Sequence, residues 1–182
     1  MYNYYLIIRL MKQSKTTQWI NKHYQSNLKD SDYNHVKDFL LLWNLLENDI
    51  FANNFAIPTA ELKIDSFIIA GRISEIEINK LFGYFQNKYT EDGIRMSGLF
   101  NNLMFRGRDR MEFVENMLLS NNSTLNEKTL AIMIIVWRYR NNLFHGLKDI
   151  TRINYQKNNF LRANKFLMLM LEANILGQLD TE

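Results

Sequence analysis

The chain has 182 residues, with 22 lysines and arginines, 19 aspartates and glutamates, and no cysteine. This length fits one domain whose core needs neither disulfides nor a structural metal. The absence of cysteine excludes disulfide frameworks, thiolate metal sites and cysteine nucleophiles, and is compatible with the reducing cytoplasm, where we expect the protein. The longest apolar run near the start is interrupted by Arg9, so we predict neither a secretion signal nor a membrane span.

Helix is the element that the sequence favours along the whole chain. Pro58 is the only proline, and apolar residues recur at helical spacing, as in Phe39, Trp43 and Leu46. We therefore predict an all-α fold, a single helical bundle of about five to six helices that forms one domain over residues 1–182. The helices are expected at residues 3–24, 33–50, 59–89, 109–120, 125–146 and 156–177.

The first half of the chain offers few candidates for chemistry. Between Thr59 and Tyr89, β-branched and bulky apolar residues would permit strand in part, but we favour helix. Neither His23 nor His35 has a carboxylate or histidine partner at metal-binding spacing. We expect both to be ordinary surface residues, and we expect no zinc or other metal site.

A basic tract, Arg106–Arg110, precedes the helix predicted at 109–120. The tract fits a phosphate-binding turn, and it fits equally well a basic loop in which Asp109 caps the helix; we favour the cap. Further on, Thr124 is followed three residues later by Glu127, which is the pattern of a capping box. The next helix should begin there.

Positive charge is concentrated in the C-terminal third. Residues 131–170 contain a single acidic side chain, Asp149, and the seven basic residues Arg138, Arg140, Lys148, Arg152, Lys157, Arg162 and Lys165. Such a field in a nearly balanced protein favours an anionic partner, of which nucleic acid is the commonest. A solvated basic face explains the charge equally well.

Polar residues gather at the end of the helix predicted at 125–146. With about 100° between successive residues, Arg138, Asn141, Asn142 and His145 share one face. Arg140 lies about 140° from His145, a gap that a long side chain and a loosening of the helix near Gly146 would shorten. The helix dipole at this end favours the imidazolium form of His145, which suits proton transfer near neutral pH.

The segment Arg140-Asn141-Asn142-Leu143-Phe144-His145 resembles the signature of the HEPN superfamily, in which an arginine is followed by a polar residue, three further positions and a histidine. The apolar helix before it and the basic helix after it also fit. The ending Leu143–Gly146 looks more like the HEPN domains of bacterial phage-defence proteins than the nucleotidyltransferase-paired toxins. Those toxins typically carry a tyrosine two positions after the histidine, where this chain has Leu147. The resemblance covers residues 109–172 and, more loosely, 33–51.

The resemblance implies a homodimer of helical bundles in which the two motifs face each other and form one RNA-cleaving site without a metal or other cofactor. His145 would help to remove the proton of a ribose 2′-hydroxyl or would protonate the leaving oxygen, and Arg140 would stabilise the charged phosphorane. Asn141 would orient the histidine or a phosphate oxygen. We expect Arg138, Lys148 and Arg152 to contact the RNA.

The leading interpretation is a toxin or anti-phage effector that a partner, such as an antitoxin or a sensor protein, restrains. A first alternative is a HEPN-like module that has lost cleavage and binds RNA or assembles a defence complex. A second alternative is a helical interaction subunit whose basic C-terminal third binds an acidic protein.

Trp137 and Tyr139 are expected to pack rather than to stack on bases. The wide apolar stripe Phe166–Leu171 is expected to be core, with a contact to a second subunit as the alternative.

Overall fold

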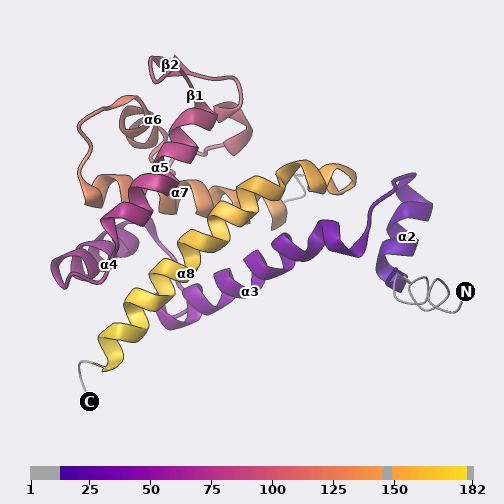
Figure 1. Cartoon of the computed structure of the whole chain (residues 1–182), viewed down its shortest axis with the longest axis horizontal. Coiled ribbons are helices and arrows are strands. Elements are labelled where there is room, and N and C mark those ends of the chain that lie inside the picture. Colours follow the sequence, from indigo (N-terminus) through magenta and orange to yellow (C-terminus); the bar gives the residue numbers. More distant parts are fainter. Residues whose placement is uncertain (1–12, 145–148, 180–182) are drawn as a thin grey trace, which may run out of the picture.

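The computed structural model describes residues 13–144 and 149–179. This part of the chain is all-α, with short 3-10 helices and one two-stranded hairpin as the other regular elements (Figure 1). In chain order the elements are α2 (Lys15–Tyr24), η1 (Asp30–Tyr33), α3 (Asn34–Asp49), α4 (Ile57–Ile69), α5 (Glu75–Tyr89), β1 (Thr90–Glu91), β2 (Arg95–Met96), η2 (Phe100–Leu103), α6 (Met111–Leu119), α7 (Leu125–Phe144), η3 (Ile150–Gln156) and α8 (Lys157–Leu179).

Helix α7 forms the centre of the fold. Every side chain from Thr129 to Val136 is buried, so the helix is covered on all sides, as expected of a helix that is apolar all round. Helices α4, α5 and α6 pack around it, and α8 packs along α3 (Figure 1). The predicted capping box is confirmed, because the Glu127 carboxylate accepts from the backbone N–H of Thr124 at 2.8 Å.

The prediction of a single helix over residues 59–89 is wrong, because two helices occupy that range. Helix α4 ends in a Schellman motif, in which the N–H of Gly71 donates to the carbonyl of Ile68 and the N–H of Arg72 to the carbonyl of Phe67, both at 2.9 Å. Gly71 has a φ of 67°, which only glycine adopts without strain. The hydroxyl of Ser74 then caps α5 by accepting from the N–H of Glu77.

Helix α2 stands at one end of the molecule, beyond the start of α3 (Figure 1). The side chain of Asp30 holds it there by accepting from the hydroxyls of Ser14 and Thr17. These hydrogen bonds lower the pKa of the Asp30 carboxyl. Among the described residues, no helix has the length and apolar character needed to cross a membrane.

Candidate functional site

Arg140 lies on the last turns of α7, and its guanidinium is held on three sides. Nη1 donates to Oδ1 of Asn141 at 3.2 Å, and Nη2 lies 3.6 Å from Oε2 of Glu47. The guanidinium carbon lies 4.9 Å from the centre of the Phe144 ring. The side chain is still 31% exposed, although its Nε is buried and has no acceptor among the described residues. A fixed and partly exposed cation is suited to binding an anion.

Glu47 reaches this site from α3 and was not selected from the sequence. Its carboxylate accepts from the indole N–H of the buried Trp43 at 2.8 Å, so the acid is oriented before it meets Arg140. Trp43 and Glu47 are four residues apart, the spacing at which helical side chains meet. That spacing was the available signal, but it could not reveal that α7 would bring an arginine to the same point.

Asn141, predicted to orient the histidine or a phosphate oxygen, is buried and hydrogen-bonds to Arg140. Its amide oxygen accepts a hydrogen bond from the guanidinium. This hydrogen bond can fix the direction of the Arg140 side chain. His145 and Lys148, both predicted site residues, lie outside the described residues.

The prediction that Arg138 contacts RNA is wrong for this structure, because its side chain is buried. Nη1 forms an ion pair with Oδ2 of Asp109 at 2.9 Å, and Nε donates to the carbonyl of Leu103 at 3.0 Å. Nη2 donates to the carbonyl of Met104 and to Oδ1 of Asn142. Every nitrogen of the guanidinium therefore has a protein partner. Burial lowers the pKa of Arg138, and the charge of Asp109 opposes that shift.

Asp109 was expected to cap the following helix, and that expectation is also wrong. Helix α6 is preceded by Arg110, which provides no side-chain cap. The buried Asp109 carboxylate instead accepts from the N–H of Arg106 at 2.6 Å and pairs with Arg138. Asn142 adds two hydrogen bonds to the same loop, to the carbonyls of Asn102 and Leu103. The polar residues of the α7 end thus fasten the loop that precedes α6.

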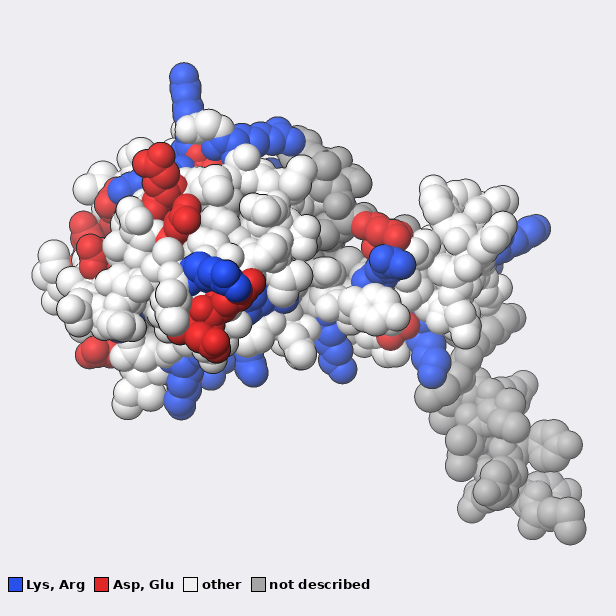
Figure 2. All heavy atoms as spheres, turned by 90° about the horizontal axis from the view of Figure 1, so that it is seen from above, with Lys and Arg blue, Asp and Glu red and all other residues white. Residues whose placement is uncertain are grey.

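The basic residues of the C-terminal third do not form one uninterrupted positive surface. Arg138 pairs with Asp109, Arg140 with Glu47, and Lys165 with Glu77. Arg152, predicted to contact RNA, is exposed, and its Nε lies 4.0 Å from a carboxylate oxygen of Asp149, the N-cap of η3. Figure 2 shows basic and acidic side chains interspersed over the visible face of the bundle. Partners distant in sequence therefore offset much of the charge that the sequence concentrates here.

The two described histidines differ in exposure. His23 is exposed, as predicted, but the prediction that His35 is a surface residue is wrong. His35 is 4% exposed and packs against Phe160 of α8 with ring centres 5.9 Å apart. Burial lowers the pKa of its imidazole. The described residues contain no cluster of histidine, aspartate and glutamate able to hold a metal ion.

The two aromatic residues beside Arg138 serve mainly in packing. Tyr139 is buried, and its hydroxyl lies 2.6 Å from that of Tyr89 on α5. Burial raises the pKa of both phenols. Trp137 is partly buried, with its ring centre 5.5 Å from that of Phe55. Tyr139 is therefore not available to stack on a base.

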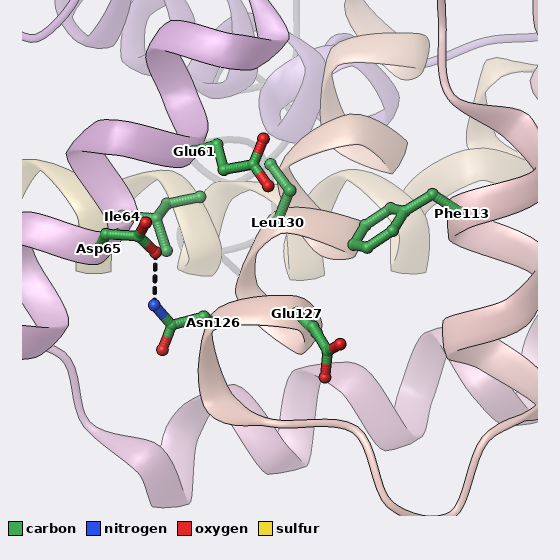
Figure 3. Close-up of a pocket in the computed structure, with 7 residues that line it drawn as sticks. All are labelled: Glu61, Ile64, Asp65, Phe113, Asn126, Glu127 and Leu130. Atoms are coloured by element: carbon green, nitrogen blue, oxygen red, sulfur yellow. Dashed lines mark hydrogen bonds between the residues drawn. The ribbon is translucent and has the colours of Figure 1, made fainter.

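A separate small pocket lies between α4, α6 and the first turn of α7 (Figure 3). Its polar lining is acidic: it contains Glu61, Asp65 and Glu127, and the Asp65 carboxylate accepts from the amide of Asn126. A phosphate would be repelled by these carboxylates, so this pocket does not suit RNA. No family model, curated protein or solved structure matches this chain.

Proposed function

We propose that this protein is an endoribonuclease of the HEPN type, which cleaves RNA without a metal and acts as a toxin or anti-phage effector. The observation that carries the proposal is the fixed, partly exposed guanidinium of Arg140, five residues before His145. A partly exposed guanidinium whose carboxylate partner is 3.6 Å away can donate to the oxygens of an in-line phosphorane.

The reaction follows from the chemistry of the two side chains. The 2′-oxygen attacks the adjacent phosphorus while His145 removes the 2′-hydroxyl proton. The bond between phosphorus and the 5′-oxygen breaks, that oxygen takes up a proton from water, and His145 then releases the proton it accepted to solvent. The products are a 2′,3′-cyclic phosphate and a 5′-hydroxyl. DNA lacks the 2′-hydroxyl and should not be cleaved.

Glu47 contributes to the proposed mechanism by holding Arg140. At 3.6 Å the two form an ion pair without a short hydrogen bond, so a substrate phosphate can replace the carboxylate as the partner of the guanidinium. Asn141 keeps its hydrogen bond during this exchange and preserves the direction of the side chain. Glu47 and Asn141 are thus positioning residues, and Arg140 and His145 the catalytic ones.

A second candidate function is complex assembly without cleavage. It is favoured by the apolar side chains that α3 and α8 expose, among them Leu41 at 67% and Leu179 at 63%. Exposed apolar surface on neighbouring helices is typical of a protein interface. In that case Arg140 would contribute to RNA binding or to assembly.

Cleavage of total RNA in excess EDTA, followed by end-group analysis, separates the two functions. We compare wild type, Arg140→Ala, His145→Ala and, as a matched control, Arg95→Ala, which removes an exposed arginine from the hairpin. We expect wild type and the control to leave 2′,3′-cyclic phosphates, and each site variant to be at least about 100-fold slower. RNA that all four proteins bind but leave intact contradicts the proposal and supports assembly.

A further inference from the structure

The loop that Arg138 fastens borders a hollow whose lining combines apolar side chains with arginine. Two adjoining hollows share Phe105, Arg106 and Met111 as lining residues. Phe100 lies beneath them as part of the core, whereas Met104 is 50% and Met111 42% exposed. The lining is thus largely apolar, and its two arginines are Arg106 and Arg110.

The backbone of this loop is held in a strained shape. Met104 has a φ of 52° and Arg110 a φ of 55°, both in the left-handed region that residues with a Cβ rarely adopt. They flank the loop on either side. Strain of this kind persists only where the surroundings impose it, and it tends to occur at binding sites.

The buried pair of Arg138 and Asp109 is what imposes the shape. Arg138 binds the carbonyls of Leu103 and Met104, and Asp109 binds both Arg138 and the N–H of Arg106. A buried ion pair adds little net stability compared with apolar residues of the same volume, because both charges must lose their hydration. Its consequence here is a fixed loop that directs Arg106 and its neighbours outward.

The arginines of this loop differ in whether they already have an ionic partner. Arg110 pairs with Glu61 at 2.6 Å and lies over the Phe113 ring. Arg106 and Arg108 are exposed and form no ion pair with another described residue. One carboxylate, Glu112, lines the hollow on the α6 side. Arg106 lines both hollows, and Arg108 follows it two residues further along the same loop.

We propose that this hollow is a subsite for one unpaired nucleotide of the RNA substrate. The base lies on Met104, Phe105 and Met111, and the phosphates on either side bind Arg106 and Arg108. An apolar platform beside guanidinium groups is the combination that binds single-stranded nucleic acid, because every base has a face to stack and every linkage a negative charge. A base-paired nucleotide keeps its faces inside the duplex, so single strands are selected.

The inference rests on the proposed function, because it takes RNA as the substrate of the α7 end. Asn142 fastens the loop from a side of α7 other than the one that carries Arg140, which pairs with Glu47 of α3. The subsite therefore binds a nucleotide away from the cleaved bond and selects RNA that is unpaired at that nucleotide.

Binding is tested by fluorescence anisotropy with a labelled single-stranded RNA and its duplex, in EDTA and in a His145→Ala background that prevents cleavage. The variant Arg106→Ala/Arg108→Ala is compared with Lys63→Ala/Arg95→Ala, which removes two exposed cations that do not line the hollow. We expect the loop variant to bind single strands at least about tenfold more weakly, and the slope of log K against log salt to fall by about 1.4, or about 0.7 per phosphate. The control should change affinity less than about twofold.

Met104→Asn separates binding from folding. Asparagine tolerates a positive φ better than methionine does, so the variant should unfold at the same or a higher temperature. It lacks the apolar surface, so single-stranded RNA should bind about 5-fold more weakly. Unchanged RNA affinity in both loop variants overturns the subsite, as does an equal loss of affinity for the duplex or for polyglutamate.

Failure of this inference is distinguishable from failure of the proposed function. If wild type cleaves RNA and the loop variants cleave single strands with unchanged kcat/KM, the subsite is refuted and the ribonuclease stands. If wild type never cleaves but the loop variants lose single-strand affinity selectively, the ribonuclease is refuted and the subsite stands.

Discussion

At the scale of single residues, the helical repeat correctly grouped Arg138 and Asn142 of α7 but did not reveal what covers them; Asn141 bonds to Arg140, and His145 lies outside the described residues. Arg138 and Asn142 do lie on one side of the helix and are hydrogen-bonded to each other. The repeat defines a direction from the helix axis, whereas burial depends on the loop of residues 102–110, which is distant in sequence. Arg140, on another side of the same helix, is the arginine that reaches solvent.

This difference leads to a prediction about Arg138 and Asp109. Asp109→Asn leaves a buried guanidinium without its counter-charge, so we expect the free energy of unfolding to fall by about 3–5 kcal/mol. Replacement of both partners, as Arg138→Met/Asp109→Leu, should cost less than Asp109→Asn alone, because no charge is left unpaired. Urea denaturation followed by circular dichroism measures both.

Asp149→Asn is the matched control, since it removes an exposed carboxylate whose neighbour Arg152 is also exposed. We expect its effect to stay within about 0.5 kcal/mol. A loss of the same small size in Asp109→Asn would show that the Arg138–Asp109 pair is not needed for stability.

At the scale of elements, most helices followed from periodicity, and the one large error was a missed break. The signals were present: Gly71 is followed by Ser74 and, three residues later, Glu77, the same box pattern that correctly placed the start of α7 at Thr124. The apolar residues on both sides continue at helical spacing, which concealed the break. The hairpin of β1 and β2 was not predicted, because two-residue strands are too short to show an alternation.

Gly71 provides the test at this scale. Gly71→Ala places a Cβ on a residue with a φ of 67°, and we expect a loss of about 1–2 kcal/mol in the free energy of unfolding. Gly71→Asn should lose less, because asparagine tolerates the left-handed region. No atom lies within 4 Å of the added Cβ, so the loss reports backbone strain and not a clash.

Gly98→Ala is the control for Gly71, because that glycine also has open space around its Cβ but no positive φ. We expect no loss of stability there. If Gly71→Ala and Gly98→Ala have equal stability, the Schellman motif does not determine where α4 ends.

At the scale of the whole molecule, the all-α class was predictable and the packing order of the helices was not. Composition and periodicity identify helices, but they do not say which pairs meet. The pairing of α3 with α8 joins residues far apart in sequence: the amide of Asn164 donates to the carbonyl of His35 at 2.9 Å. The contact of Glu47 with Arg140 depends on this long-range arrangement, which is why the carboxylate of the candidate site was missed.

The same pairing aligns exposed apolar residues across two helices. Helices α3 and α8 run side by side in the same direction from the contact of His35 with Asn164 (Figure 1). With about 1.5 Å of rise per residue, Leu41 and Leu45 lie level with the stretch of α8 that exposes Met168 and Ile175. We therefore propose the α3–α8 face as the dimer contact that the proposed function requires.

Leu41→Glu/Leu45→Glu tests this contact, because two carboxylates cannot be buried in an apolar interface without a large cost. We expect wild type to sediment as a dimer and the variant as a monomer with an unchanged helical spectrum. The matched control is Leu62→Glu/Ile69→Glu on α4, where both residues are also exposed. It should remain a dimer.

If the RNA-cleaving site is built from two subunits, the α3 variant should lose cleavage together with dimerisation, and the two losses should follow the same dependence on protein concentration. Cleavage that persists in a monomer would place the complete site within one chain.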